Sequence, residues 1–353
     1  MTTKIVKVDP HNPQEEPINQ AAQELARGGL VIIPTETVYG IAANALNKQA
    51  VEKLSEIKKR PKDKPFSLHI DEKIKIEHFA KDIPISAYKL INKFWPGPLT
   101  VVLQAKDGGT IGIRMPDNEV ALRIISLAKV PVVCPSANLS GKNPPVSFEE
   151  AIKDLNGLVD LAVDAGETKL KTESTVVDLT VEPLRVLREG AIKQADIEAV
   201  AKRKVILFVC TGNSCRSVMA EGLMKKKLQD LDRKNVDVIS AGIVLVGGFG
   251  ATFDTRQLLA REGIDASGHL SQRVSREMIK EADLVLVMER LHEQRILQIA
   301  PDAKNRVYLL KEFAKIGDDN DLDIADPIGK PLEFYEYTFG IIKEAVERVS
   351  QLI

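Results

Sequence analysis

A continuous apolar run, "VILFVC", leads directly into the segment "TGNSCRS" at residues 205–217, and this junction constrains the fold more than any other part of the chain. The run predicts a buried strand, and the sequence "SVMAEGLMKKKLQDL" that follows predicts a helix. Further apolar runs, "VDVISAG", "DLVLVM" and "RVYLL", alternate with helical patterns up to the C-terminus. This alternation predicts an α/β domain with a doubly wound parallel sheet.

Cys210 and Arg216 lie six positions apart in this junction, in the pattern C-x5-R. Amides at the N-terminus of a helix attract an anion, and a loop of successive amides can surround phosphate oxygens. Gly212 frees the backbone for such a loop, and Arg216 can add a bidentate contact to the same oxygens. The same field favours the thiolate of Cys210, a nucleophile. The segment therefore predicts a phosphate loop, in which Ser217 donates to the thiolate and Asn213 holds the backbone.

Two other interpretations of the cysteines are open from the residues alone. Cys210 could be an inert buried thiol, or part of a zinc site. The zinc site is disfavoured because the five histidines are scattered, and we expect no tightly bound metal. Three cysteines, a small and odd number, argue against a disulfide scaffold and for a reducing compartment. We expect a cytoplasmic protein.

The octet "CTGNSCRS" resembles the signature of the low-molecular-weight protein tyrosine phosphatase family, and the resemblance extends over about residues 204–353. Further matches are "SAG" at 240–242, "EADLVLVM" at 281–288, His292 and the "DP" pair at Asp326. The resemblance implies a cysteine-dependent phosphatase acting on a phosphoprotein, with Cys210 as nucleophile, Arg216 as phosphate binder and Asp326 as general acid. It also implies a phosphate loop made of Thr211, Gly212, Asn213, Ser214, Cys215 and Ser217.

Ser214 bears on the substrate of this domain. The tyrosine phosphatases have an aliphatic residue at that position, whereas the related protein-arginine phosphatases have a threonine. A small hydroxyl side chain leaves space and a polar contact for a guanidinium, so phosphoarginine is favoured over phosphotyrosine. An arsenate reductase-like domain is a further alternative, but that redox cycle needs two cysteines downstream, and none follows Cys215.

The first 200 residues have a different pattern of predicted elements, with many short strands and few helices. This pattern predicts a large twisted mixed sheet. "PTETVYG" at 34–40 and "PSANLSG" at 135–141 each place small polar residues at the end of an apolar strand. "KKRPKDKP" at 58–65 is strongly basic. Singly, these segments are as compatible with polar turns and a solvated helix end as with a binding site.

Together and in this order, the segments resemble the YrdC-type threonylcarbamoyl-adenylate synthases over about residues 10–195, with "FWPGPLT", "GIRMP", "STVVD" and "LREGA" as additional matches. The resemblance implies that L-threonine, bicarbonate and ATP, with Mg²⁺, react to threonylcarbamoyl-AMP and pyrophosphate. The product would serve the t6A modification of tRNA through the t6A-transfer machinery. The ATP-binding residues implied are Lys58, Arg60, Ser136, Asn138, Ser174 and Arg188; those for threonine are Thr35, His69 and Arg114.

The polar segment "IKQADIEAVAKRK" separates the two patterns, so we predict domains at 1–200 and 201–353. A net charge of -1 and an aromatic content of 5% give no sign of a nucleic-acid surface, although local charge leaves direct tRNA binding open. No run of 18 apolar residues predicts a membrane span. The alternative to a two-enzyme fusion is that one domain is a catalytically silent regulatory or RNA-binding module.

Overall fold

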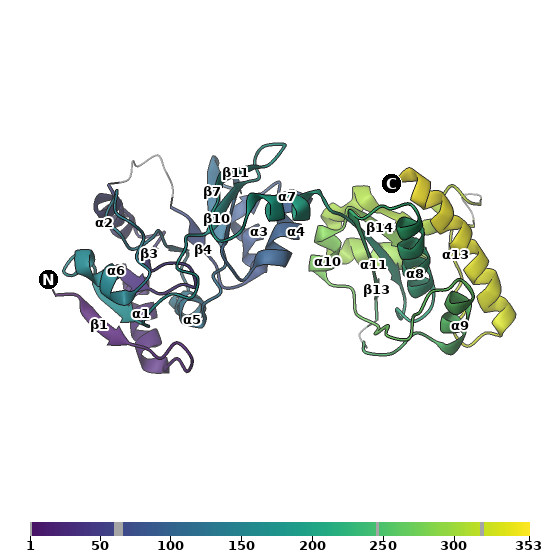
Figure 1. Cartoon of the computed structure of the whole chain (residues 1–353), viewed down its shortest axis with the longest axis horizontal. Coiled ribbons are helices and arrows are strands. Elements are labelled where there is room, and N and C mark those ends of the chain that lie inside the picture. The colour runs from purple at the N-terminus through teal and green to yellow at the C-terminus, as the bar shows by residue number, and fades with distance from the viewer. Residues whose placement is uncertain (1, 60–65, 245–246, 318–320) are drawn as a thin grey trace. The chain divides into compact units, whose positions relative to one another are not determined.

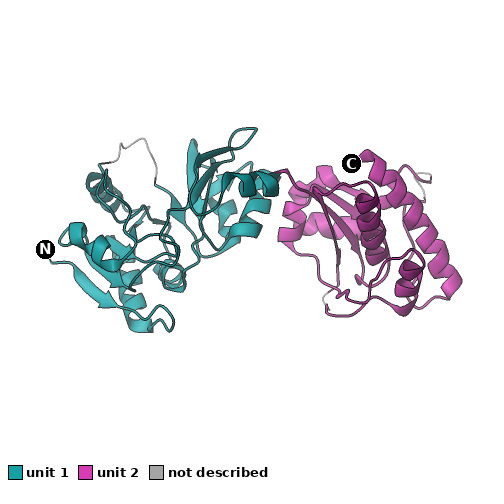
Figure 2. Ribbon diagram, in the orientation of Figure 1, with its two compact units in different colours: residues 1–201 teal, residues 202–353 magenta. Residues whose placement is uncertain are grey.

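The structure, a computed structural model, describes residues 2–59, 66–244, 247–317 and 321–353. The chain folds into two compact units, residues 1–201 and 202–353, which are coloured separately in Figure 2. Each unit is described by itself below.

Unit 1 is built on an 11-stranded mixed sheet (Figure 1) with the strand order β1-β9-β2-β3-β8-β4-β7-β6-β10-β11, and β5 pairs with β6. Its strands are β1 (Lys4–Lys7), β2 (Val31–Ile33), β3 (Gly40–Asn44), β4 (Leu68–His69), β5 (Ala80–Lys81), β6 (Leu99–Ala105), β7 (Thr110–Arg114), β8 (Val132–Val133), β9 (Leu161–Asp164), β10 (Thr175–Asp178) and β11 (Arg185–Arg188). The helices are α1 (Glu15–Arg27), α2 (Lys48–Lys58), the 3-10 helix η1 (Lys73–Lys75), α3 (Ile76–Phe79), α4 (Ile85–Phe94), α5 (Glu119–Ala128), α6 (Phe148–Leu155) and α7 (Gln194–Lys202). Parallel pairs such as β1–β9 and antiparallel pairs such as β2–β3 occur together, which confirms the predicted mixed sheet.

Hydrophobic periodicity explains the helices that cover this sheet. Ile18 and Leu25 lie on the buried stripe of α1, and they share a core with Ile124 of α5 and with Ile33 of β2. Gly28 ends α1 in the left-handed conformation (φ 94°), and its amide donates to carbonyls of the last helical turn. A residue with a side chain would be strained in this conformation, so glycine is favoured at position 28.

Unit 2 has a four-stranded, fully parallel sheet in the order β13-β12-β14-β15. Its strands are β12 (Lys204–Cys210), β13 (Val236–Gly242), β14 (Leu284–Val287) and β15 (Val307–Leu309). Its helices are α8 (Arg216–Asp230), α9 (Phe253–Arg261), α10 (Arg276–Glu281), α11 (Arg290–Ile299), the 3-10 helix η2 (Pro301–Arg306), α12 (Leu310–Phe313) and α13 (Leu332–Leu352).

Alternate residues of β12 enter two different cores, as a strand buried on both faces requires. Phe208 packs in the core that contains α8 and α13, which run side by side in Figure 1. Leu207 and Val209 pack in the core formed with α10 and α11. Helices therefore cover both faces of the sheet, which confirms the predicted doubly wound unit. β12 ends at Cys210, so its carboxyl end presents the loop of residues 211–215 to the N-terminus of α8.

Candidate active sites

Unit 1 contains a cavity of about 800 Å³ that opens between the carboxyl end of β2, helix α2 and the strands β4, β7 and β11. Eight of the residues predicted for ATP and threonine line it: Thr35, Lys58, His69, Arg114, Ser136, Asn138, Ser174 and Arg188. Arg60, the ninth, lies outside the described residues. The fold thus brings together side chains from segments up to about 150 residues apart.

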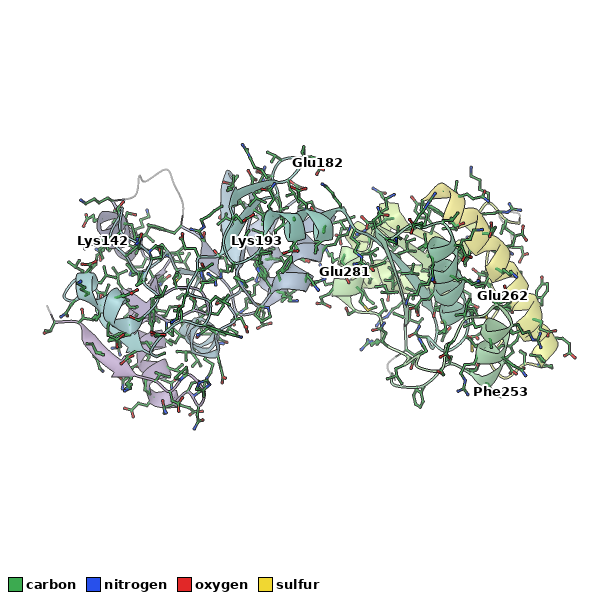
Figure 3. The ribbon with its side chains drawn as sticks, viewed as in Figure 1. Lys142, Glu182, Lys193, Phe253, Glu262 and Glu281 are labelled. Atoms are coloured by element: carbon green, nitrogen blue, oxygen red, sulfur yellow. The ribbon has the colours of Figure 1, made fainter. Side chains whose placement is uncertain are left out.

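Lys58, the last residue of α2, is bound to the loop that follows β8. Its ammonium donates to the carbonyl of Ser136 (2.8 Å), the carbonyl of Asn138 (2.7 Å) and Oδ1 of Asn138 (2.8 Å). The loop ends near Lys142, labelled in Figure 3, whose carbonyl accepts from the Asn138 amide at 2.5 Å. An ammonium has three N–H donors, and here oxygens of the protein itself accept hydrogen bonds from it. In this structure the Lys58 side chain therefore holds the loop, and its role in ATP binding stays a prediction.

Arg114, at the end of β7, is buried and bonded to the turn after β2. Its Nη2 donates to Glu36 Oε1 at 2.6 Å and to Thr37 Oγ1 at 2.9 Å, and its Nε donates to the Gly97 carbonyl at 3.3 Å. The Thr35 hydroxyl donates to the Val38 carbonyl at 2.6 Å, so Thr37 must be the donor in its 2.9 Å bond with Thr35. The hydroxyl of Thr35 is thus occupied within the turn.

His69, on β4 beside Arg114, is 5% exposed and lines the cavity, and its Nδ1 has no hydrogen-bond partner among the described residues. Burial, together with the positive charge of Arg114, lowers the pKa of His69 to about 3. The imidazole is neutral at physiological pH, so it can exchange a hydrogen bond with a ligand but adds no charge.

Arg188, on β11, completes the cavity wall. Its Nε donates to the Ser174 carbonyl at 3.0 Å and its Nη2 to the Ser174 hydroxyl at 3.1 Å, and its Nη1 forms a short ion pair with Glu173. The sequence interpretation missed Glu173 and the partners of Arg114, because carboxylates that hold an arginine have no pattern of their own.

In unit 2, Cys210 and the phosphate loop have the expected local geometry. The Cys210 thiol is buried, 3.0 Å from the Ser217 hydroxyl and 3.3 Å from the Asn213 amide. Asn213 Nδ2 donates to the Ser217 hydroxyl at 3.0 Å, which leaves the proton of that hydroxyl for Cys210. Two hydrogen-bond donors therefore point at the Cys210 sulfur.

Asn213 adopts a left-handed conformation (φ 53°) and holds the loop mainly through its side chain. Nδ2 also donates to the Ser240 hydroxyl at 2.7 Å, and Oδ1 accepts from the Gln272 amide at 2.9 Å. Gly242 lies directly against this loop, and a Cβ there would come within 2.7 Å of the Thr211 carbonyl. This close approach explains the glycine of "SAG".

Arg216 is fully buried, and its guanidinium connects the loop with two carboxylates. Nη1 donates to the Ile324 carbonyl at 2.6 Å and lies 3.2 Å from Glu289; Nη2 forms a short ion pair with Asp326. Nε is buried and has no partner among the residues that the structure describes, so it is a donor that an anion's oxygen would satisfy. The structure thus brings Asp326 to the arginine from 110 residues away, and it adds Glu289, which the sequence interpretation missed.

Cys215 and Ser214 lie on the other side of the loop. The Cys215 thiol is buried, 3.5 Å from the Thr252 hydroxyl and 3.7 Å from the Tyr335 hydroxyl. Ser214 is half-buried, and its carbonyl accepts from the Thr252 amide at 3.0 Å; among the described residues, its hydroxyl has only a long contact, 3.7 Å, to Cys215. The Ser214 hydroxyl is therefore available to a ligand. Phe253, which follows Thr252 and is labelled in Figure 3, begins α9.

Comparison with known proteins identifies the family to which unit 1 belongs. The Sua5, YciO and YrdC family model, described as "Telomere recombination", matches residues 23–190. The threonylcarbamoyl-AMP synthase of Pyrococcus abyssi is 35% identical over 320 residues, 79% of this chain and 94% of that protein. The crystal structure of P. abyssi Sua5 complexed with L-threonine aligns with a TM-score of 0.53 at 32% identity, over 69% of this chain and 93% of that one.

Unit 2 matches a second family, the low molecular weight phosphotyrosine protein phosphatases, over residues 205–353. The protein-arginine-phosphatase of Geobacillus stearothermophilus is 36% identical over 146 residues, 41% of this chain and 93% of that protein. The chain belongs to both families. The Sua5-type unit therefore contains the large cavity, and the phosphatase-family unit contains the Cys210 loop.

His292, at the start of α11, supports the loop of the phosphatase-family unit. Its Nδ1 accepts from the Glu289 amide at 3.0 Å, so the ring proton is on Nε2, 2.9 Å from the Thr211 hydroxyl. Burial and the neighbouring Arg216 lower the pKa of His292 to about 3. The ring therefore stays neutral in the folded protein far below the pH at which an unfolded histidine is protonated.

We expect this histidine to make the phosphatase-family unit less stable in acid. Above pH 6.5 the ring is neutral in both states and has no effect; as the pH falls below 6.5, only the unfolded chain gains the proton. With a folded pKa of about 3, the loss amounts to about 2 kcal/mol between pH 7 and pH 5. Urea-dependent hydrogen exchange, read on peptides of residues 202–353, measures it. His292→Asn should reduce the drop, and His11→Asn, at an exposed site, should not; an equal drop in His292→Asn contradicts the assignment.

No helix in the described part of the chain is long and apolar enough to cross a membrane. Within the same residues, no group of three or more histidine, cysteine, aspartate or glutamate side chains is arranged to hold a metal ion.

Proposed function

We propose that the chain is a bifunctional enzyme, and that its Sua5-type unit converts L-threonine, bicarbonate and ATP to threonylcarbamoyl-AMP and pyrophosphate. The observation that carries this proposal is the convergence of eight predicted residues on one cavity of about 800 Å³, large enough for a nucleotide with an amino acid beside it. Relatives named threonylcarbamoyl-AMP synthase support the reaction. The product would pass to the t6A-transfer machinery that modifies tRNA.

The chemistry of the cavity residues suggests which substrate each would bind. Arg114 would bind the threonine carboxylate, and the neutral His69 would exchange a hydrogen bond with the amine or hydroxyl of the substrate. Arg188 and the loop held by Lys58 would face the nucleotide. Mg²⁺ fits as a companion of ATP, held by the phosphates, and when bound it would neutralise charge on the triphosphate. Exclusion of water from the occupied cavity would also protect a labile carbamate.

This reaction is tested by pyrophosphate release from ATP by the purified full chain, with and without L-threonine and bicarbonate. We expect release that requires both, and a product with the mass of threonylcarbamoyl-AMP. Pyrophosphate release that is independent of threonine, or tight RNA binding without release, would contradict the proposal.

For the phosphatase-family unit, we propose hydrolysis of a phosphoprotein by way of a phosphocysteine. The Cys210 thiolate attacks phosphorus, Arg216 and the loop amides hold the three remaining phosphate oxygens, and Asp326 gives a proton to the leaving group. Water then attacks the phosphocysteine, with Asp326 taking the proton, and releases inorganic phosphate. The two donors aimed at the Cys210 sulfur and the unpartnered Nε of Arg216 support this sequence.

We infer that phosphoarginine is preferred over phosphotyrosine, because the accessible Ser214 hydroxyl can accept from a guanidinium. Ser214→Ile should lower kcat/KM for a phosphoarginine peptide about tenfold relative to the matching phosphotyrosine peptide, since it removes a polar contact and fills space. Steady-state kinetics on both peptides provides the measurement. The same ratio in wild type and variant would rule out this role.

We place the protein in the cytoplasm. All three cysteines are free thiols, which suits a reducing compartment.

A further inference from the structure

The turn "TETV" after β2 is bonded to Arg114 more extensively than a connection between two strands requires. Arg114 and Glu36 form a buried ion pair, with side chains 6% and 2% exposed. The Thr37 hydroxyl is a second acceptor for Nη2 of Arg114, and it is held in place by its own hydrogen bond to the Thr35 hydroxyl. A buried charge pair is costly to desolvate, so it is kept where it supplies geometry.

The bonds leave one edge of the guanidinium free. Nη2 is held by Glu36 and Thr37, and Nε is held by the Gly97 carbonyl. Nη1 has no protein partner among the described residues, and Arg114 lines the cavity. The nitrogen left over is therefore the one that a ligand can reach.

Glu36 lies behind the arginine rather than in the cavity, because its side chain is almost fully buried and does not line the wall. Its Oε2 is buried and has no partner in the described part of the chain, where Arg114 is the side chain that holds the carboxylate. Without Glu36, the guanidinium would lose its strongest anchor and could turn within a cavity of this size.

We propose that Glu36 is a positioning residue for amino-acid binding: it aims Nη1 of Arg114 at the substrate carboxylate. The proposal rests on the function proposed above and names how its threonine subsite is built. Glu36 acts through Arg114, so its contribution depends on that arginine and is specific to the substrate that carries the carboxylate.

The test is threonine-dependent pyrophosphate release by the full-length Glu36→Gln and Glu36→Ala variants, with KM measured separately for threonine and for ATP. Glu36→Gln keeps the volume and an acceptor oxygen, and Glu36→Ala removes both. We expect KM for threonine to rise at least tenfold in Glu36→Ala and less in Glu36→Gln, with KM for ATP within twofold of wild type. Glu167→Gln, a matched change at an exposed ion pair with Lys171, should leave both constants unchanged.

A double-mutant cycle separates positioning from a structural role. In an Arg114→Ala background, adding Glu36→Ala should change KM for threonine less than twofold. An unchanged KM in both single variants, or a loss of equal size with and without Arg114, would overturn the inference. If Glu36→Ala fails to fold, the same comparison is made with Glu36→Gln: its effect on KM for threonine is measured in the wild-type and in the Arg114→Ala background. Absence of threonine-dependent release in wild type would instead overturn the proposed function.

Discussion

Cys210→Ser is expected to abolish phosphatase activity, with kcat/KM reduced by about 10⁴-fold or more. A serine hydroxyl ionises far less readily than a thiol and is a much weaker nucleophile at neutral pH. Hydrolysis of a phosphoarginine peptide and of p-nitrophenyl phosphate provides the measurement. Intact mass after incubation with substrate reports any phosphoenzyme.

The control for Cys210→Ser is already present in the same chain. The Sua5-type unit has its own cores and its own cavity, with no residue of 202–353 among those that line it. Threonine-dependent pyrophosphate release should therefore stay within twofold of wild type. Full phosphatase activity in Cys210→Ser would exclude the thiolate mechanism, and joint loss of both activities would show a coupling between the units.

Lys58→Ala is expected to lower kcat/KM for pyrophosphate release about 100-fold or more. The variant removes the ammonium from three part-buried acceptors of the loop after β8, of which Asn138 Oδ1 keeps a bond from the Ser136 hydroxyl. The loop would then rearrange, and Ser136 and Asn138 would leave the cavity wall. Activity and thermal unfolding are both measured, because the same bonds support stability.

Two further variants make the Lys58 result specific. Lys58→Arg keeps the charge but cannot place three donors as an ammonium does, so we expect a partial loss. Lys48→Ala changes an exposed lysine at the start of the same helix and should have little effect. Near-normal activity in Lys58→Ala would show that the loop keeps its shape without the lysine.

Much of this molecule was predictable because its signals are local. The continuous apolar run of β12 and the helical patterns around it predict burial on both faces of the strand, and the sheet has that form. The C-x5-R spacing places Cys210 at a strand end and Arg216 at a helix start, because the five residues between them form the loop. The N-terminal motifs likewise all reach one cavity, although each one alone resembled a plain turn.

The partners of the charged side chains were not predictable, because they come from distant positions. Glu289 reaches Arg216 and Glu173 reaches Arg188 only after the strands have paired. The family resemblance implied Lys58 as an ATP-binding residue, but nothing in the sequence showed that its ammonium would bond to a loop 78 residues away. Carboxylates and carbonyls of this kind carry no spacing or periodicity that marks them as partners.

The sequence by itself determined two domains, the strand–loop–helix at Cys210 and the residue types in each site, since backbone preference and hydrophobic periodicity act over a few residues. Only the tertiary structure decided which groups are neutral, which cations are already paired and which donors remain free. Those properties depend on burial and on distances of about 3 Å between residues far apart in the chain, as the lowered pKa of His69 and the bond of Arg114 Nη2 to Glu36 show.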